Sequence, residues 1–168
     1  MASPRYITLC ASLPALGPVL AAKTPPINRA RLTSRLRASL TSEDFAQLEL
    51  ASRIITWQEA GRHEGDAAAV ADARRVIAAI DSPTFAAYLG ARMEMRTAVA
   101  ALRRRFAGEG PPDATTAWGY GRYLRRMRAN WSEPAFGVGH AFPWLPEADR
   151  ALSQGDAARM ERMVLDAA

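Results

Sequence analysis

Cysteine and histidine are scarce in this chain of 168 residues. Cys10 is the only cysteine, and His63 and His140 are the only histidines. A single cysteine cannot form an internal disulfide, which indicates a reducing compartment and excludes cysteine-rich zinc modules. The histidines stand far apart, and "HEGD" at 63–66 is not the His-Glu-x-x-His pattern of a helical zinc site. The sequence therefore predicts no metal site and no cofactor.

The residue arrangements typical of an active site are also missing. Cys10 stands among apolar residues, where a thiol is unreactive, and no serine has the Gly-x-Ser-x-Gly context of a nucleophile. The adjacent acids Glu43 and Asp44 stand at a predicted helix start, where they complement the helix dipole. "GYG" at 119–121 and "GVGH" at 137–140 lack the third glycine of a dinucleotide-binding turn. We therefore expect that the protein is not an enzyme.

Long hydrophobic runs are absent as well. No apolar run of about 18 residues is free of helix breakers, so the sequence predicts no membrane-spanning helix. "RYITLCASLPALGPVLAAK" at 5–23 resembles a secretory signal, although Pro14 and Pro18 interrupt its apolar run. The preferred interpretation is that residues 1–27 form an apolar extended or turn segment packed on the rest of the chain. A cleaved signal over residues 1–22 is the alternative.

Lysine is almost absent, because 21 of the 22 basic side chains are arginines. The net charge of +5 is unevenly distributed: residues 1–41 carry +6, residues 42–91 carry −4, residues 92–128 carry +6 and residues 129–168 carry −3. Such blocks predict two basic faces and pairing between oppositely charged segments. A GC-rich genome would also favour alanine and arginine, but it explains the composition better than the segregation.

The remaining sequence predicts helices joined by short breaks. We therefore expect an all-α fold, a helical bundle of about five to seven helices in one domain over residues 1–168. Capping signals mark helix starts at Asn28, Thr41, Ser82 and Asp156. Further helices are predicted over 67–80 and 113–131, and a connection rich in proline, glycine and aromatic residues precedes the last helices. The only strand candidate, Tyr6–Leu9, cannot form a sheet alone.

The predicted helix that begins at Ser82 has the clearest pattern. Its apolar positions follow each other in steps of three and four residues, which is a heptad seam of about six turns. The seam consists of Phe85, Tyr88, Arg92, Met95, Val99, Leu102 and Phe106. Arg92 is its single charge. A buried guanidinium needs an acidic partner, for which the acidic block offers Glu49 and Glu59.

Two segments after this helix contain further candidate residues. On the predicted helix 113–131, Arg122, Arg125 and Arg126 share a face that could bind a partner. The segment 134–145, "PAFGVGHAFPWL", contains no acid and no catalytic group, so burial is its main available chemistry. It is predicted to be a hydrophobic plug; an exposed docking patch is the alternative. Its candidate side chains are Phe136, Phe142 and Trp144.

"YITLCASLP" at 6–14 has the pattern aromatic–x–x–Leu–x–Ala–Ser/Gly–Leu–Pro, which resembles the opening of a family associated with bacterial V/A-type ATPases. That family looks like a reduced C subunit (the d subunit of eukaryotic enzymes). "PINRARLTSRL", "ALRRRFAGEGPP" and "NWSEPAFGVGHAFPWL" resemble other segments of the family. The resemblance implies an all-helical, non-catalytic protein between the membrane rotor ring and the central stalk, in the cytoplasm at the inner face of the membrane. The chain is short for a full C subunit.

Two other functions stay open. Arg122, Arg125, Arg126 and Arg128 beside tyrosine and tryptophan fit a basic helical protein that binds nucleic acid. Exposed aromatic side chains between these arginines would favour that function, and buried ones would oppose it. The third possibility is an exported helical protein, which depends on whether the mature chain begins near Met1 or near Lys23.

Overall fold

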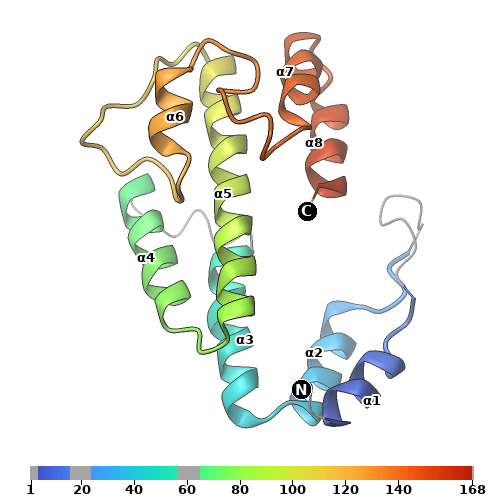
Figure 1. Cartoon of the computed structure of the whole chain (residues 1–168). Coiled ribbons are helices and arrows are strands. Elements are labelled where there is room, and N and C mark those ends of the chain that lie inside the picture. The colour runs from blue at the N-terminus through green and yellow to red at the C-terminus, as the bar shows by residue number, and fades with distance from the viewer. Residues whose placement is uncertain (1–3, 16–23, 57–64, 168) are drawn as a thin grey trace. The chain divides into compact units, whose positions relative to one another are not determined.

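The computed structural model describes residues 4–15, 24–56 and 65–167, and within these ranges it contains eight helices and no strand (Figure 1). The prediction of an all-α helical bundle is therefore confirmed. The helices are α1 (Pro4–Ser12), α2 (Arg29–Ser39), α3 (Ser42–Ile55), α4 (Asp66–Ala78), α5 (Pro83–Phe106), α6 (Leu124–Ala129), α7 (Leu145–Ser153) and α8 (Ala157–Asp166).

The chain divides into two compact units, Met1–Ser52 and Arg53–Ala168, where the sequence predicted a single domain. The reason lies in the distribution of apolar side chains. Helix α2 buries none of its residues, whereas α5 alone buries eight. The main hydrophobic core belongs entirely to the second unit, which also contains most of the candidate functional residues.

In the first unit, α1 corrects the prediction of an extended or turn segment over residues 1–27. Residues 4–12 form a helix, so the strand candidate Tyr6–Leu9 is wrong too. Leu9 is buried, and the Tyr6 hydroxyl, one turn away on the helix, donates a hydrogen bond to the carboxylate of Asp44. The Arg35 guanidinium donates to the carbonyl of Ser12, the last residue of α1 (2.7 Å). These contacts stabilise α1, which is too short to be stable from helix propensity alone.

The helix starts agree with the predicted capping signals. At each predicted start, a side-chain oxygen accepts a hydrogen bond from the backbone N–H three residues further on, which satisfies a donor that the helix leaves unpaired. The four pairs are Asn28 with Arg31 (2.8 Å), Thr41 with Asp44 (3.1 Å), Ser82 with Phe85 (3.3 Å) and Asp156 with Arg159 (2.9 Å).

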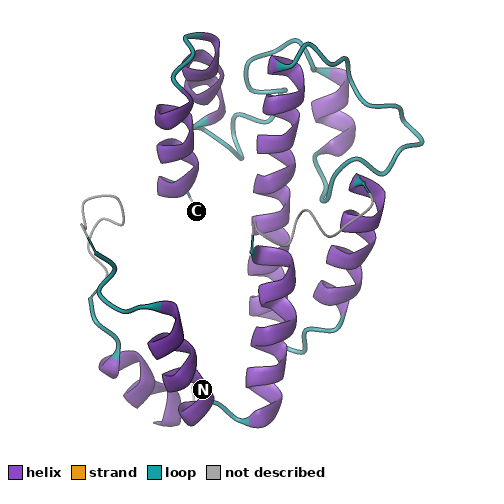
Figure 2. Cartoon of the chain, turned by 180° about the vertical axis from the view of Figure 1, so that it is seen from behind, coloured by secondary structure: helices purple, strands orange, loops and turns teal. Residues whose placement is uncertain are grey.

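Helix α5 is the axis of the second unit. Both views place α4 and α6 to one side of α5 and the α7–α8 pair to the other (Figures 1 and 2). Helices α4 and α7 pack directly against α5, and α8 packs on α7. The core between them joins α5 to side chains from α6, α7, α8 and the connecting segments. Two different sides of α5 are therefore available to carry functional residues.

The side chains of the heptad seam predicted on α5 are buried only in the middle of the helix. Met95, Val99 and Leu102 are buried, as predicted. Tyr88 and Phe106, near the two ends, are 49% and 61% exposed. The seam prediction is therefore wrong at these two ends, where the aromatic side chains are exposed. Leu89, Met93, Thr97, Ala98 and Ala101, which lie off the seam, are buried instead.

The prediction of a helix over 113–131 is also wrong in its first half. Within this range only α6 (Leu124–Ala129) is helical. Side chains replace the missing helical hydrogen bonds of the preceding segment. The Tyr120 N–H donates to the Thr97 hydroxyl of α5 (2.8 Å), and that hydroxyl lies 3.1 Å from the Tyr120 carbonyl oxygen. Asp113 accepts hydrogen bonds from the backbone N–H and the hydroxyl of Thr115. Gly119 permits the close approach to Thr97.

We expect Gly119→Ala to lower the free energy of unfolding by about 1–3 kcal/mol, as overpacking does. A Cβ at this position would lie 2.5 Å from Thr97 Cγ2 and 2.9 Å from Leu124 Cδ2. Gly110→Ala is the matched control, because a Cβ there would meet no atom within 4 Å. Thermal and urea unfolding of both variants measures the difference. Equal stabilities would contradict the tight contact between Gly119 and α5.

Candidate functional site

The arginine face consists of Arg122, Arg125 and Arg126, at the start of α6 and in its first turn. All three side chains are exposed. Arg122 is held by Glu94 of α5, whose carboxylate oxygen Oε1 lies 3.4 Å from Arg122 Nε and accepts the Arg122 backbone N–H at 3.0 Å. Arg125 and Arg126 make no ion pair within the part of the chain that the structure describes. The structure thus brings the three predicted residues together, with two of their charges available to a partner.

Arg128, the fourth arginine of this segment, lies apart from the arginine face. Its side chain is half-buried, and its charge acts on Asp113. Hydrogen bonds from Thr115 hold the pKa of Asp113 below its usual value, with a smaller contribution from Arg128. Arg128 therefore belongs to the electrostatics of the preceding loop.

The aromatic segment, residues 134–145, fills the core of the second unit. Phe136 is fully buried, Phe142 is buried, and Trp144 is half-buried and packs against the same core. Their rings belong to two groups of aromatic contacts. In one group the ring centroids of Trp131 and Phe136 are 5.2 Å apart, and in the other the centroid of Phe142 lies 5.7 Å from that of Tyr123 and 6.1 Å from that of Trp144. This is the burial that the plug interpretation predicts.

An unusual backbone conformation turns the aromatic segment into the core. Phe136 has a backbone φ of +51°, which residues other than glycine rarely adopt, and Gly137 follows with a φ of +67°. A Cβ on Gly137 would lie 2.8 Å from Asn130 Nδ2, so glycine is needed there for space as well as for conformation. Surrounding contacts must hold Phe136 in this conformation.

Arg105, near the end of α5, supplies those contacts. Its Nη1 donates to the carbonyl oxygens of Trp131 (3.0 Å) and Glu133, and its Nη2 donates to the carbonyl of Pro134 (3.2 Å) and to the Asp149 carboxylate of α7 (2.6 Å). The guanidinium carbon also lies 4.0 Å from the centroid of the Phe136 ring. The sequence pattern did not indicate this residue. Nothing local distinguishes it from the neighbouring arginines of "RRR", because its partners lie 26 to 44 residues further along the chain.

Arg92 was predicted to be buried in the seam and paired with Glu49 or Glu59, but its environment is different. It is half-buried and lines a groove between α5 and α8. Of the two predicted partners, Glu49 pairs with Arg37 inside the first unit (3.3 Å), and Glu59 lies outside the described residues. Burial lowers the pKa of Arg96, one turn further along α5, and the positive charge of Arg92 lowers it further.

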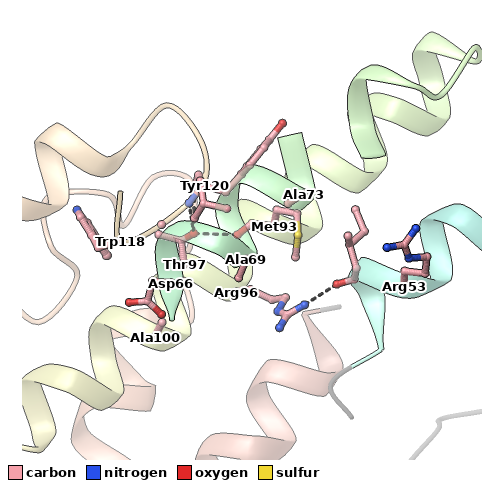
Figure 3. A pocket seen from close by; sticks show the side chains of 13 residues that line it. Arg53, Asp66, Ala69, Ala73, Met93, Arg96, Thr97, Ala100, Trp118 and Tyr120 are labelled. Atoms are coloured by element: carbon pink, nitrogen blue, oxygen red, sulfur yellow. Dashed lines mark hydrogen bonds between the residues drawn. The ribbon is translucent and has the colours of Figure 1, made fainter. Parts of the chain in front are cut away.

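A cavity of about 130 Å³ lies where the last turn of α3 meets α4, α5 and residues 118–120 (Figure 3). Its charged side chains are Arg53, Asp66 and Arg96. Each is engaged: Arg96 Nη1 donates to the Ile54 carbonyl, Asp66 pairs with Arg104 (2.5 Å), and Arg53 lies 4.0 Å from the buried carboxylate of Asp72. These interactions tie helices together, and the arrangement offers no nucleophile paired with a base.

Neither a metal site nor a membrane-spanning helix is found in the described ranges. They contain no group of three or more histidine, cysteine, aspartate or glutamate residues able to hold a metal ion. None of the helices described is both long enough and apolar enough to cross a membrane. Comparison of the chain with known protein families, with curated proteins and with solved structures gives no match. The functional interpretation therefore depends on the arginine face and the aromatic segment themselves.

We expect Phe136→Ala to lower the free energy of unfolding by about 3–5 kcal/mol, because it removes a fully buried ring and leaves a cavity. Phe106→Ala removes the same side chain from an exposed position and should change stability by no more than about 0.5 kcal/mol. Chemical unfolding followed by tryptophan fluorescence compares the two. A Phe136→Ala protein as stable as the wild type would mean that the aromatic segment is not part of the core.

We expect Arg105→Lys to destabilise the protein by about 1.5–3 kcal/mol although it preserves the charge. A lysine ammonium cannot reproduce the planar fork that binds three carbonyls and a carboxylate at once. Arg162→Lys, on an exposed part of α8, is the control and should be neutral. The measurement is the unfolding midpoint in urea. Equal midpoints for the two variants would show that the guanidinium geometry of Arg105 is unimportant.

Proposed function

We propose that this protein is a non-catalytic, protein-binding subunit that docks on an acidic surface of its partner through the arginine face. The observation that carries the proposal is the separation of charge from aromatic surface around α6. The exposed side chains are arginines, while the neighbouring Trp118, Trp131 and Phe142 are buried in the core. Charge is thus the chief means by which this surface can recognise a partner.

The same separation argues against nucleic acid as the partner. Proteins that bind single strands place aromatic rings between basic side chains, so that bases can stack on them. Near the arginine face, Tyr123 is half-buried and packs edge-on with the ring of Phe142. The Arg122 guanidinium lies 5.0 Å from the centroid of the Tyr123 ring. A base would have to displace these contacts before it could stack.

The arginine face is held in place before any partner binds. Met127, on the inner side of α6, is almost fully buried. Thr97 holds the backbone of Tyr120, and Glu94 holds both the backbone and the side chain of Arg122. Preorganised charges lose little conformational entropy on binding, which favours a specific complex over diffuse attraction.

The particular complex that we propose is a bacterial V/A-type ATPase. In that assembly the protein would link the central stalk to the membrane rotor ring, in the cytoplasm at the inner face of the membrane. The resemblance of residues 6–14 and 130–145 to a C-subunit-like family supports this assignment. An all-helical protein with an exposed basic surface is compatible with such a linking role.

The test is capture of the ATPase by the tagged full chain from detergent-solubilised membranes of the cells that encode it. We expect stalk or ring subunits to be recovered, and the recovery to fall by about tenfold with Arg125→Glu/Arg126→Glu. Arg150→Glu/Arg162→Glu changes the net charge equally at two exposed sites on α7 and α8, and it should leave capture intact. Recovery should also fall as the salt concentration rises.

Two outcomes would contradict the proposal. Recovery of no rotary ATPase subunit would exclude the particular complex, and equal recovery with both double variants would exclude the arginine face. Mobility-shift assays with short duplex and single-stranded DNA at physiological salt should give no specific complex. A tight, sequence-dependent complex would replace protein docking with nucleic-acid binding as the function of this surface.

A further inference from the structure

His140 is the one histidine within the part of the chain that the structure describes, since His63 lies outside it. Its side chain is exposed and makes no hydrogen bond or ion pair with any described residue. The imidazole instead packs against the ring of Tyr123 in a T-shaped contact, with 5.8 Å between the two centroids. Its polar ring atoms are therefore open to a partner molecule.

A tight turn of the aromatic segment holds His140 at the surface. Val138, two residues before it, is fully buried, and Phe142, two residues after it, is buried as well. The backbone N–H groups of Ala141 and Phe142 both donate to the Val138 carbonyl, at 2.9 and 3.0 Å, which closes the turn. Because both ends of the turn are anchored in the core, the backbone position of His140 is fixed.

Two contacts place this turn beside the arginine face. The Tyr123 ring that touches the imidazole also lies 5.0 Å from the guanidinium carbon of Arg122. The Arg126 side chain lies against Gly137, since a Cβ on that glycine would be 3.4 Å from Arg126 Nε. The two distances to the Tyr123 ring put His140 no more than about 11 Å from the Arg122 guanidinium, close to the screening length of about 8–10 Å at physiological salt. The arginine face therefore continues onto His140.

No carboxylate pairs with His140 among the residues that the structure describes. The charged and titratable groups of the neighbouring elements are Arg122, Tyr123, Arg125 and Arg126 at the start of α6, Glu94 of α5, Glu133 before the turn, and Glu147, Asp149 and Arg150 of α7. Three of these four carboxylates have an arginine partner: Glu94 pairs with Arg122, Asp149 with Arg105 and Glu147 with Arg159. A positive charge on the imidazole is thus not neutralised within the chain and stays available to a partner.

We propose that His140 extends the arginine face and makes it bind an acidic partner surface more tightly at mildly acidic pH. An imidazole gains a positive charge as the pH falls from about 8 to about 5, and a carboxylate placed beside it favours the charged form. Protonation and docking therefore strengthen each other. The inference rests on the proposed function, because it needs an acidic partner on the arginine face. It adds a pH dependence that arginines, charged throughout this range, cannot supply.

A defined acidic probe tests this proposal on the full chain. The probe is a short, fluorescently labelled peptide in which aspartate and glycine alternate, with both ends blocked. Its carboxylates stay ionised at about pH 5.5 and at about pH 7.5, because both values lie well above the reference pKa of aspartate. The dissociation constant is measured at these two pH values and at one low salt concentration, where exposed charges are screened least. We expect the wild-type protein to bind the peptide about threefold more tightly at the lower pH.

Three single variants assign the pH dependence to one side chain. His140→Gln removes the titrating group and should bind the peptide equally well at both pH values. His140→Arg is charged at both and should bind at the higher pH as tightly as the wild type does at the lower pH. His63→Gln, at the only other histidine of the chain, is the matched control and should keep the threefold difference. The set separates His140 from every other group that titrates in this range, including the chain's amino group.

The role of His140 and the arginine face itself fail in different ways. A pH dependence that survives unchanged in His140→Gln, or a wild-type affinity that does not change with pH, would overturn the role of His140 and leave the arginine face standing. Arg125→Glu/Arg126→Glu should weaken the peptide about tenfold at both pH values. Equal binding by this double variant and the wild type would contradict the arginine face, and the role of His140 would fall with it.

Discussion

The guanidinium of Arg105 connects α5 to the aromatic segment and to α7 within the second unit. Helix α6 ends at Ala129, and the backbone that follows enters the core through a series of short hydrogen-bonded turns. Several of its carbonyl oxygens also accept hydrogen bonds from a side chain of α5. Arg105 supplies donors to three of them and to Asp149, and it covers the Phe136 ring, so one side chain connects α5, the aromatic segment and α7. Helix α8 packs in turn on α7.

The arginine face depends on α5 for its geometry. Helix α6 has six residues and no side-chain cap, too few for a stable helix on its own, so contacts with Thr97 and Glu94 of α5 position its arginines.

Local signals made part of this architecture predictable. The caps at Asn28, Thr41, Ser82 and Asp156 were recognised because their partners lie three residues away. Helix α5 ends two residues before Gly108, which has a φ of +80° that glycine adopts readily. The arginines of α6 and the burial of Phe136 and Phe142 followed from spacing and composition. The loop over 113–123 was not predictable, because its conformation depends on Thr97, more than twenty residues earlier. Arg105 and the open ends of the α5 stripe escaped prediction for the same reason: distant segments decide which side chains are covered.

The order of the elements along the chain has a consequence for synthesis. Helix α5 is complete at Phe106, but Asp149 comes 44 residues after Arg105, which binds it, and α8 comes later still. At a translation rate of about 5–20 residues per second, the apolar stripe of α5 leaves the ribosome seconds before the segments that cover its middle. An amphipathic helix exposed for that long is a substrate for chaperones and a starting point for aggregation. The helix that organises the finished second unit is thus its most vulnerable part while the chain is being made.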